Sequence, residues 1–169
     1  MTENFRTNPL GEGLNLYRKD GWRGQFARIQ RWHARVQEFR DARSDPSHFD
    51  EYQDFLHTFF QNCNHLADWI THDFPGGQAR VEKLLADTVE LRTCRDICNA
   101  TKHHTLTSAP KVRDGFADGV EYSPVSWPTA KPLANQTWFV IAGGKKYDVF
   151  DLVDRCFLAW QRFVADLEA

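Results

Sequence analysis

The sequence predicts a mainly α protein, namely a four-helix bundle with a small β-hairpin insertion before its last helix. Three observations predict this class. Apolar residues recur at helical spacing in four segments, two extended apolar runs flank Gly143 and Gly144, and 169 residues suffice for one domain with its own core. Aromatic residues make up 14% of the chain, which argues against intrinsic disorder of its body.

The chain divides into an arm and one domain. Residues 1–20 mix Gly, Pro and Asn with few apolar anchors, so we expect an N-terminal arm. Residues 21–169 are expected to form a single helical-bundle domain with a β-rich insertion at about 105–148. Its first helix spans about 22–42, and its second begins at the Asp- and Pro-containing stretch near 45–51 and ends near 73. Their inner stripes are Trp22, Phe26, Ile29, His33 and Val36 in the first helix, and Phe55, Phe59, Leu66 and Ile70 in the second.

A third helix is expected from about 77 to 103, and a last helix follows a cap at Asp148 or Asp151. The core stripe of the third helix comprises Val81, Leu84, Leu85, Thr88 and Leu91. That of the last helix comprises Val153, Phe157, Trp160 and Val164, with Leu152 and Phe163 beside it.

Polar residues take over the stripe of the third helix in its last turns. At the same period, the next residues on that face are Arg92, Arg95, Asn99, Lys102 and His103. Burying such groups costs several kcal/mol unless each is paired. In a structural interpretation, Arg95 pairs with Asp73 or Asp96 and Asn99 holds a helix end. In a functional interpretation, the cluster opens onto a groove, where Arg stabilises a phosphate and His exchanges a proton.

Two further polar faces have alternative interpretations. The outer side of the first helix carries Arg28, Arg31 and Arg35. These arginines form either a solvated cationic face or a surface that contacts phosphate. Histidines and aspartates share the outer side of the second helix, which suggests a metal site, but they face away from the core, so a solvated or subunit-facing stripe is preferred. The members of this second face are Asp50, Asp54, His57, Gln61, His65, Asp68 and His72.

Composition narrows the function classes. The net charge is −2 and no phosphate-binding loop or dinucleotide fingerprint is present, so we expect no cofactor and no double-stranded DNA partner. No apolar segment is long enough to cross a membrane, and a cytoplasmic location is expected. The four cysteines (Cys63, Cys94, Cys98, Cys156) form no CxxC pair and are expected to be buried free thiols. Nucleophilic chemistry by Cys94 or Cys98 has no supporting motif.

Two stretches on successive helices, NCNHLADWITHD and CRDICNATKHHTL, resemble the HEPN-like superfamily, in particular its uncharacterised bacterial and phage-associated members. The resemblance covers residues 45–106 well and the last helix loosely, and leaves out the arm and the β-rich insertion. It implies a helical bundle that acts as a homodimer. Many such domains are metal-independent endoribonucleases of the toxin or phage-defence type.

The resemblance also implies roles for single residues. Arg95 matches the arginine that holds the scissile phosphate, Asp96 the polar residue after it, and His103 the histidine that activates the 2′-hydroxyl or protonates the leaving oxygen. In the ribonuclease hypothesis, Asn99 would join Arg95 and His103 in the catalytic site as a positioning group. Lys102, Arg92 and His104 would bind the substrate, and the Arg28, Arg31 and Arg35 face would guide the RNA backbone. Seven residues separate Arg95 from His103, more than is usual in the family. This spacing keeps open a non-catalytic dimerisation or protein-binding module.

Overall fold

The computed structural model describes residues 20–42, 49–102, 116–117, 139–142 and 144–169. Within these ranges the chain forms helices α2 (Gly21–Ala42), α3 (Phe49–Asp73), α4 (Gly77–Asp87), α5 (Val89–Lys102) and α6 (Val149–Glu168). It also forms strands β1 (Phe116–Ala117), β2 (Phe139–Ala142) and β3 (Lys145–Asp148). The mainly α class and the hairpin before the last helix are confirmed. Nearly all of the predicted arm and most of the predicted insertion lie outside the described residues.

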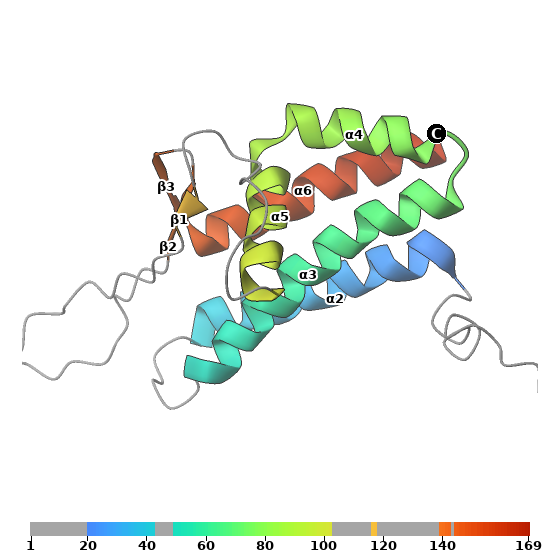
Figure 1. The fold of residues 1–169 in the computed structure, drawn as a ribbon. Coiled ribbons are helices and arrows are strands. Elements are labelled where there is room, and N and C mark those ends of the chain that lie inside the picture. Colours follow the sequence, from blue (N-terminus) through green and yellow to red (C-terminus); the bar gives the residue numbers. More distant parts are fainter. Residues whose placement is uncertain (1–19, 43–48, 103–115, 118–138, 143) are drawn as a thin grey trace, which may run out of the picture.

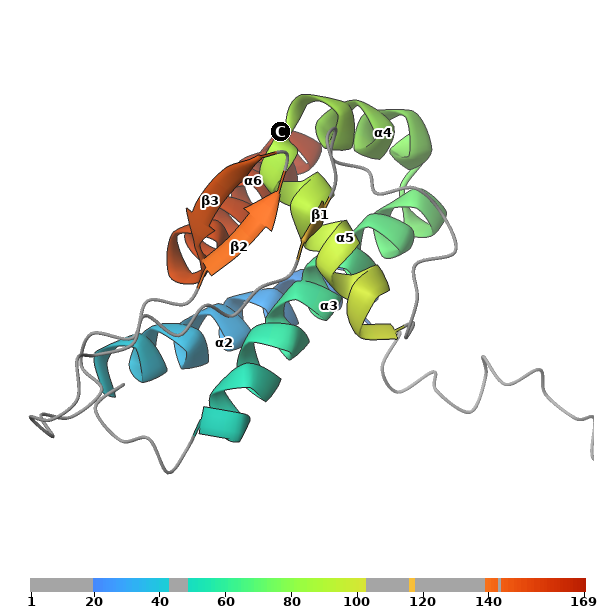
Figure 2. The ribbon, with the colours of Figure 1, turned by 60° about the vertical axis from the view of Figure 1, so that its left-hand side comes forward.

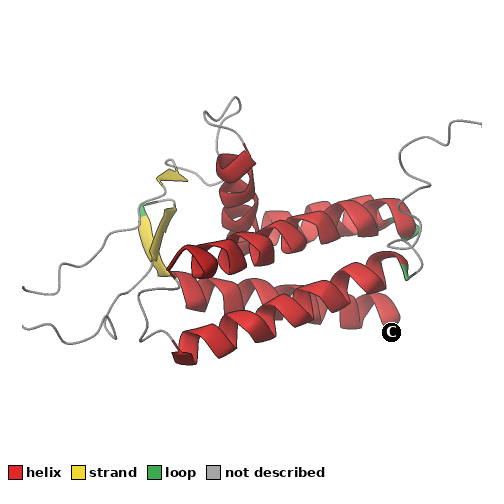
Figure 3. Ribbon diagram, turned by 90° about the horizontal axis from the view of Figure 1, so that it is seen from below, coloured by secondary structure: helices red, strands yellow, loops and turns green. Residues whose placement is uncertain are grey.

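The central helix of the bundle is α3, which contacts each of the other four described helices. In Figure 1, α4 runs alongside α6, whereas α5 runs at a steep angle to both. Seen from below, in Figure 3, the longer helices follow roughly one direction and the strands lie at one end of them. The core therefore fills the space around α3, and α5 closes it from the side.

The predicted apolar stripes of α2, α3 and α6 are confirmed. Ile29 and Val36 of α2, Leu66 and Ile70 of α3 and Val153 of α6 are completely buried. Residues of this kind contribute about 1.5–3 kcal/mol each when fully removed from water. The stripes keep one helical period from end to end, so each helix presents a single apolar face to the core.

The prediction of one helix over 77–103 is wrong, because the helix is interrupted at Thr88. Thr88 has an extended backbone with φ −120° and ψ 102°, and it separates α4 from α5. Thr88 and Val89 are both β-branched, which lowers helix propensity at this point. An extended residue turns the chain by more than the 100° of a helical residue, so the inner face of α5 is no longer in phase with that of α4.

A tight turn joins α3 to α4 and depends on two glycines. Gly76 has φ +71°, a conformation that residues with a Cβ atom rarely adopt. Gly77 lies against the end of α3, where an added Cβ would stand 2.2 Å from the Ile70 carbonyl oxygen. The Gly77 amide donates to the Phe74 carbonyl at 2.8 Å and closes the turn. Gly76 is therefore needed for its backbone conformation and Gly77 for its lack of a side chain.

The hairpin leads directly into α6. β2 pairs antiparallel with β3 from Phe139 opposite Asp148 to Ala142 opposite Lys145, and β1 pairs with the other edge of β2. Figure 2 shows the two longer strands beside the first turns of α6, which β3 contacts. Asp148 ends β3 and caps α6, because its carboxylate accepts from the amides of Phe150 (2.9 Å) and Asp151 (3.1 Å). Of the two predicted caps, Asp148 is the one used.

Candidate functional site

Helix α5 is enclosed by protein on most of its surface. Among residues 91–98, all of which the structure describes, Arg95 is the one exposed side chain. The prediction that Arg95 belongs to the inner face of this helix is therefore wrong. The residues that face inward are Leu91, Thr93, Cys94, Asp96, Ile97 and Cys98.

Arg95 and Asn99 share the open side of α5, one helical turn apart. Asn99 is half-buried, and Lys102 ends the helix. The guanidinium of Arg95 makes no ion pair with Asp73 or Asp96, the partners that the structural interpretation assigned to it, and Asp96 points into the core, where it is 2% exposed. His103 and His104 lie outside the described residues, as does the side chain of Lys102. The predicted pairing of Arg95 with His103 therefore stays a prediction.

Arg92 has a structural role that the sequence did not indicate. Its Nη1 donates to the Leu85 carbonyl at 3.0 Å and to the Ala86 carbonyl, both in the last turn of α4. Carbonyl groups at a helix C-terminus lack partners within the helix, and a cation there also interacts favourably with the helix dipole. Arg92 thus holds the end of α4 against the start of α5, across the break at Thr88, and its predicted substrate role has no support in this arrangement.

The arginines on the outer side of α2 are associated with tryptophans. Arg35 is exposed and lies over the Trp32 ring, with its Cζ 4.5 Å from the ring centroid. Arg31 is exposed beside it. Arg28 is half-buried, donates to the Gln25 carboxamide oxygen at 2.9 Å, and lies 5.9 Å from the centroid of Trp69 on α3. The outer side of α2 therefore carries the predicted arginines, and two of them lie against tryptophan rings.

The polar stripe on α3 follows the outer side of the helix, as predicted. Asp54, His65, Asp68 and His72 are exposed, and His57 is half-buried. Burial lowers the pKa of His57, and the nearby Asp54 carboxylate partly offsets this effect. Among the residues that the structure describes, no group of three or more His, Cys, Asp or Glu is arranged to hold a metal ion.

The four cysteines are buried free thiols, as predicted. Cys94 donates to the Phe60 carbonyl at 3.3 Å and Cys156 to the Glu90 carbonyl at 3.4 Å. Burial raises the pKa of Cys63 and of Cys94, and a hydrogen bond with Cys94, together with burial, raises that of Cys98. Thiols with raised pKa values are poor nucleophiles, so Cys63, Cys94 and Cys98 act as packing residues.

Sequence reasoning missed a polar network between α2 and α6. The Asp154 carboxylate lies 2.8 Å from His33 Nε2 and accepts from Gln37 (2.7 Å) and Arg40 (3.0 Å). The His33 ring stacks on Phe157 at 4.0 Å between centroids. The spacing of His33, Gln37 and Arg40 on one helix face was a usable signal, but their acceptor is more than 110 positions away in the chain.

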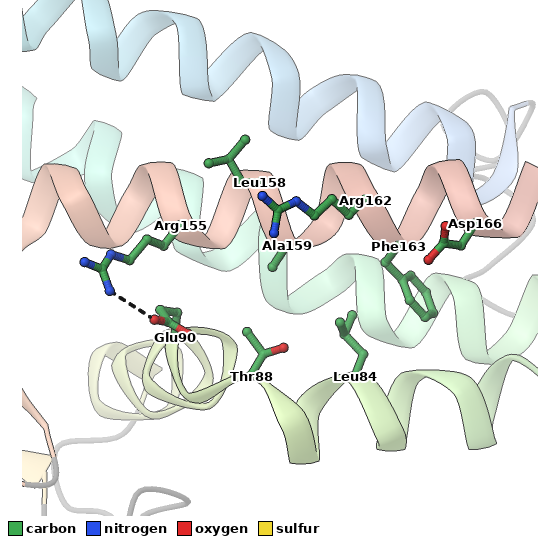
Figure 4. Close-up of a pocket in the computed structure, with 9 residues that line it drawn as sticks. All are labelled: Leu84, Thr88, Glu90, Arg155, Leu158, Ala159, Arg162, Phe163 and Asp166. Atoms are coloured by element: carbon green, nitrogen blue, oxygen red, sulfur yellow. Dashed lines mark hydrogen bonds and ion pairs between the residues drawn. The ribbon is translucent and has the colours of Figure 1, made fainter.

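A second unpredicted feature is a hollow of about 460 Å³ between α6 and the α4–α5 break. Figure 4 shows Arg155, Leu158 and Arg162 projecting from α6, and Leu84 and Thr88 on the opposite wall. Arg155 pairs with Glu90 at 3.4 Å. Leu158 is 45% exposed, and no other large hydrophobic side chain among the described residues is classed as exposed. The remaining lining residues are Ala159, Phe163 and Asp166.

Comparison with known proteins adds no family to this geometry. No family model, curated protein or solved structure matches the chain. None of the helices that the structure describes has the length and apolar character needed to cross a membrane.

Proposed function

We propose that the chain is a HEPN-like helical-bundle protein that acts on RNA as a metal-independent endoribonuclease. The observation that carries the proposal is the exposure of Arg95 on an otherwise enclosed helix, with Asn99 one turn away. Arg95 makes no ion pair with a carboxylate of the described residues, and the planar guanidinium of an exposed arginine matches the oxygens of a phosphate. The motif resemblance supports the same residue.

The roles follow from the chemistry of RNA cleavage. Arg95 would neutralise the charge that develops on the scissile phosphate. Such electrostatic stabilisation usually makes the largest single contribution to lowering the activation barrier. His103, with a pKa near neutrality in its unperturbed state, would transfer the proton to or from the 2′-hydroxyl or the leaving oxygen. Asn99 and Lys102 would position the backbone. A separation of eight positions corresponds to about 12 Å of rise in an ideal helix, so a homodimer would supply the Arg95 and His103 pair from two subunits.

The test is cleavage of several RNA classes by the purified chain in EDTA. The parent is expected to cleave in the chelator, and Arg95→Ala and His103→Ala are each expected to reduce the rate at least 100-fold, in line with the loss of a key electrostatic or proton-transfer group. Arg80→Ala is the matched control, because Arg80 is an exposed arginine on α4. Cleavage by either site variant at the parent rate contradicts the proposal.

A second candidate is a non-catalytic dimerisation or protein-binding module. The hollow between α6 and the α4–α5 break favours it, because Leu158 is exposed on its rim and Leu84 and Phe163 line it. Exposed apolar groups beside a hollow mark protein-binding surfaces. Sedimentation of the parent and of Leu158→Glu tests this candidate. Association that the substitution abolishes, without any RNA cleavage in the parent, supports the module and removes the ribonuclease.

A further inference from the structure

We propose that single-stranded RNA binds along the seam of α2 and α3, on an arginine–tryptophan strip made of Arg28, Arg31, Trp32, Arg35 and Trp69. The inference rests on the proposed action on RNA and names the form of the substrate and its binding surface. It does not depend on Arg95, so binding and cleavage are separable. Three observations carry it: the distribution of charge along α2, the geometry of the two tryptophans, and a hollow beside one of them.

At each end of α2 an arginine is paired with a carboxylate of α6. Arg23 pairs with Glu168 at 2.9 Å, and Arg40 pairs with Asp154 at 3.0 Å. In contrast, Arg31 and Arg35 are exposed and make no ion pair with any residue that the structure describes. A chain of net charge −2 thus has a local cationic surface in the middle of α2.

The tryptophans orient two of these arginines. Arg35 lies over Trp32, and Phe55 of α3 supports the same ring at 5.8 Å between centroids and 51° between planes. A guanidinium that stacks on a ring keeps its N–H groups at the edge available for phosphate oxygens. Arg28 extends the strip to Trp69. From Arg28 to Arg35 the helix rises about 10 Å, so the strip contacts a few nucleotides.

A hollow of about 440 Å³ lies at the Trp69 end of the strip and is lined by Trp69, Asp68, His72 and Asp73. Its volume falls in the range of about 300–1,000 Å³ that small-molecule sites occupy. Trp69 offers an aromatic surface for a base, and the carboxylates can accept from the N–H groups of a base edge. Carboxylates repel phosphate, so this hollow suits a base and the arginines suit the backbone.

This division of contacts selects a single strand. Bases in an A-form duplex are stacked and paired, and a duplex presents phosphates and 2′-hydroxyls to a protein. A single strand offers free base faces for stacking together with its backbone charge. Glu38 is exposed on α2 one turn after Arg35, and its carboxylate opposes the RNA charge. We therefore expect moderate affinity with strong salt dependence.

The test is fluorescence anisotropy of a labelled 12-nucleotide RNA with the full chain at several salt concentrations. The 2′-hydroxyls of the RNA are methylated, so the chain cannot cleave it during the measurement. The Arg31→Ala/Arg35→Ala variant is expected to bind at least ten-fold more weakly, with a salt slope lower by about 1.4, because each lost phosphate contact removes about 0.7. Trp69→Leu is expected to weaken binding about ten-fold and leave the slope unchanged, whereas Trp69→Phe retains most of the affinity. Circular dichroism confirms the fold of each variant.

The matched control is Arg80→Ala, since Arg80 also lies over an aromatic ring, at 5.5 Å from Phe74, but on α4. It is expected to bind like the parent. Parent affinity in the Arg31→Ala/Arg35→Ala variant, or equal affinity for a duplex of the same sequence, overturns the strip. Binding that depends on the strip in a chain that cleaves no RNA retains the strip and rejects the ribonuclease. RNA cleavage that depends on Arg95 but not on the strip supports the ribonuclease and rejects the strip.

Discussion

Helix α6 and the α4–α5 segment differ in the length over which apolar residues keep one helical spacing. In α6 a single apolar stripe, capped by Asp148, continues for 20 residues and places Val153, Trp160 and Val164 in the core. In residues 77–102 the same kind of stripe holds for 11 residues and is then reset by Thr88. The difference teaches that helical periodicity predicts a face only as far as the backbone stays helical. One extended residue moved Arg95 from an expected inner position to the surface.

The largest expected effect concerns the uninterrupted helix. Trp160 is 1% exposed, and Trp160→Ala is expected to lower the free energy of unfolding by about 3–5 kcal/mol, because it removes a large buried side chain and leaves a cavity. Urea denaturation measures the loss. Trp160→Phe sharpens the test: the indole Nε1 makes no hydrogen bond with any described residue, so Phe is expected to cost less than half as much. Similar costs for Ala and Phe would contradict this packing.

The next effect concerns the entry to the interrupted segment. Gly77→Ala is expected to cost about 3 kcal/mol or more, because the new methyl group would overlap the Ile70 carbonyl and shift α4. Gly76→Asn is the comparison, since Asn tolerates the left-handed conformation and nothing lies within 4 Å of the added Cβ. Thermal unfolding followed by circular dichroism ranks the two. A Gly77→Ala protein as stable as Gly76→Asn would show that the turn is looser than described.

The break itself is tested at Arg92. Arg92→Ala is expected to cost about 1–2 kcal/mol, because two hydrogen bonds to the last carbonyls of α4 are lost. Arg92→Lys keeps the charge at the helix end but not the two-carbonyl geometry, so it should recover part of the loss. Urea titration of the three proteins gives the order. Full stability of Arg92→Ala would mean that Arg92 does not hold α4 to α5.

A smaller effect is expected at the cap of α6. Asp148→Ala removes the acceptor of the Phe150 and Asp151 amides and is expected to cost about 1 kcal/mol. Asp148→Ser keeps a capping oxygen and should restore most of the stability. Thermal denaturation distinguishes the two. An Ala variant that melts with the parent would remove the cap from the account of why α6 begins where it does.

The features predicted correctly from the sequence are those set by neighbours in the chain. The inward positions of Ile29, Leu66 and Val153 follow from helical spacing, and the Asp148 cap follows from residue type at a helix start. The break was missed because Thr88 and Val89 carry none of the Gly or Pro signals that usually end a helix. The Asp154 network was missed because its partners lie more than 110 positions apart in the chain, and the Arg92 contacts were missed because they depend on the unpredicted break at Thr88. At the candidate site, Arg95 was expected on the inner face of its helix but is exposed, and the functional roles of Arg95 and Asn99 stay a prediction.

The most direct test of the central claim, that α5 presents Arg95 outward for RNA chemistry, is a paired measurement on Arg95→Ala. Its unfolding free energy is expected to stay within about 0.5 kcal/mol of the parent, as for an exposed side chain that makes no ion pair with any described residue. Its RNA cleavage in EDTA is expected to fall at least 100-fold. Unchanged cleavage would remove Arg95 from the chemistry. A stability loss of several kcal/mol would instead return Arg95 to the buried network that its exposure contradicts.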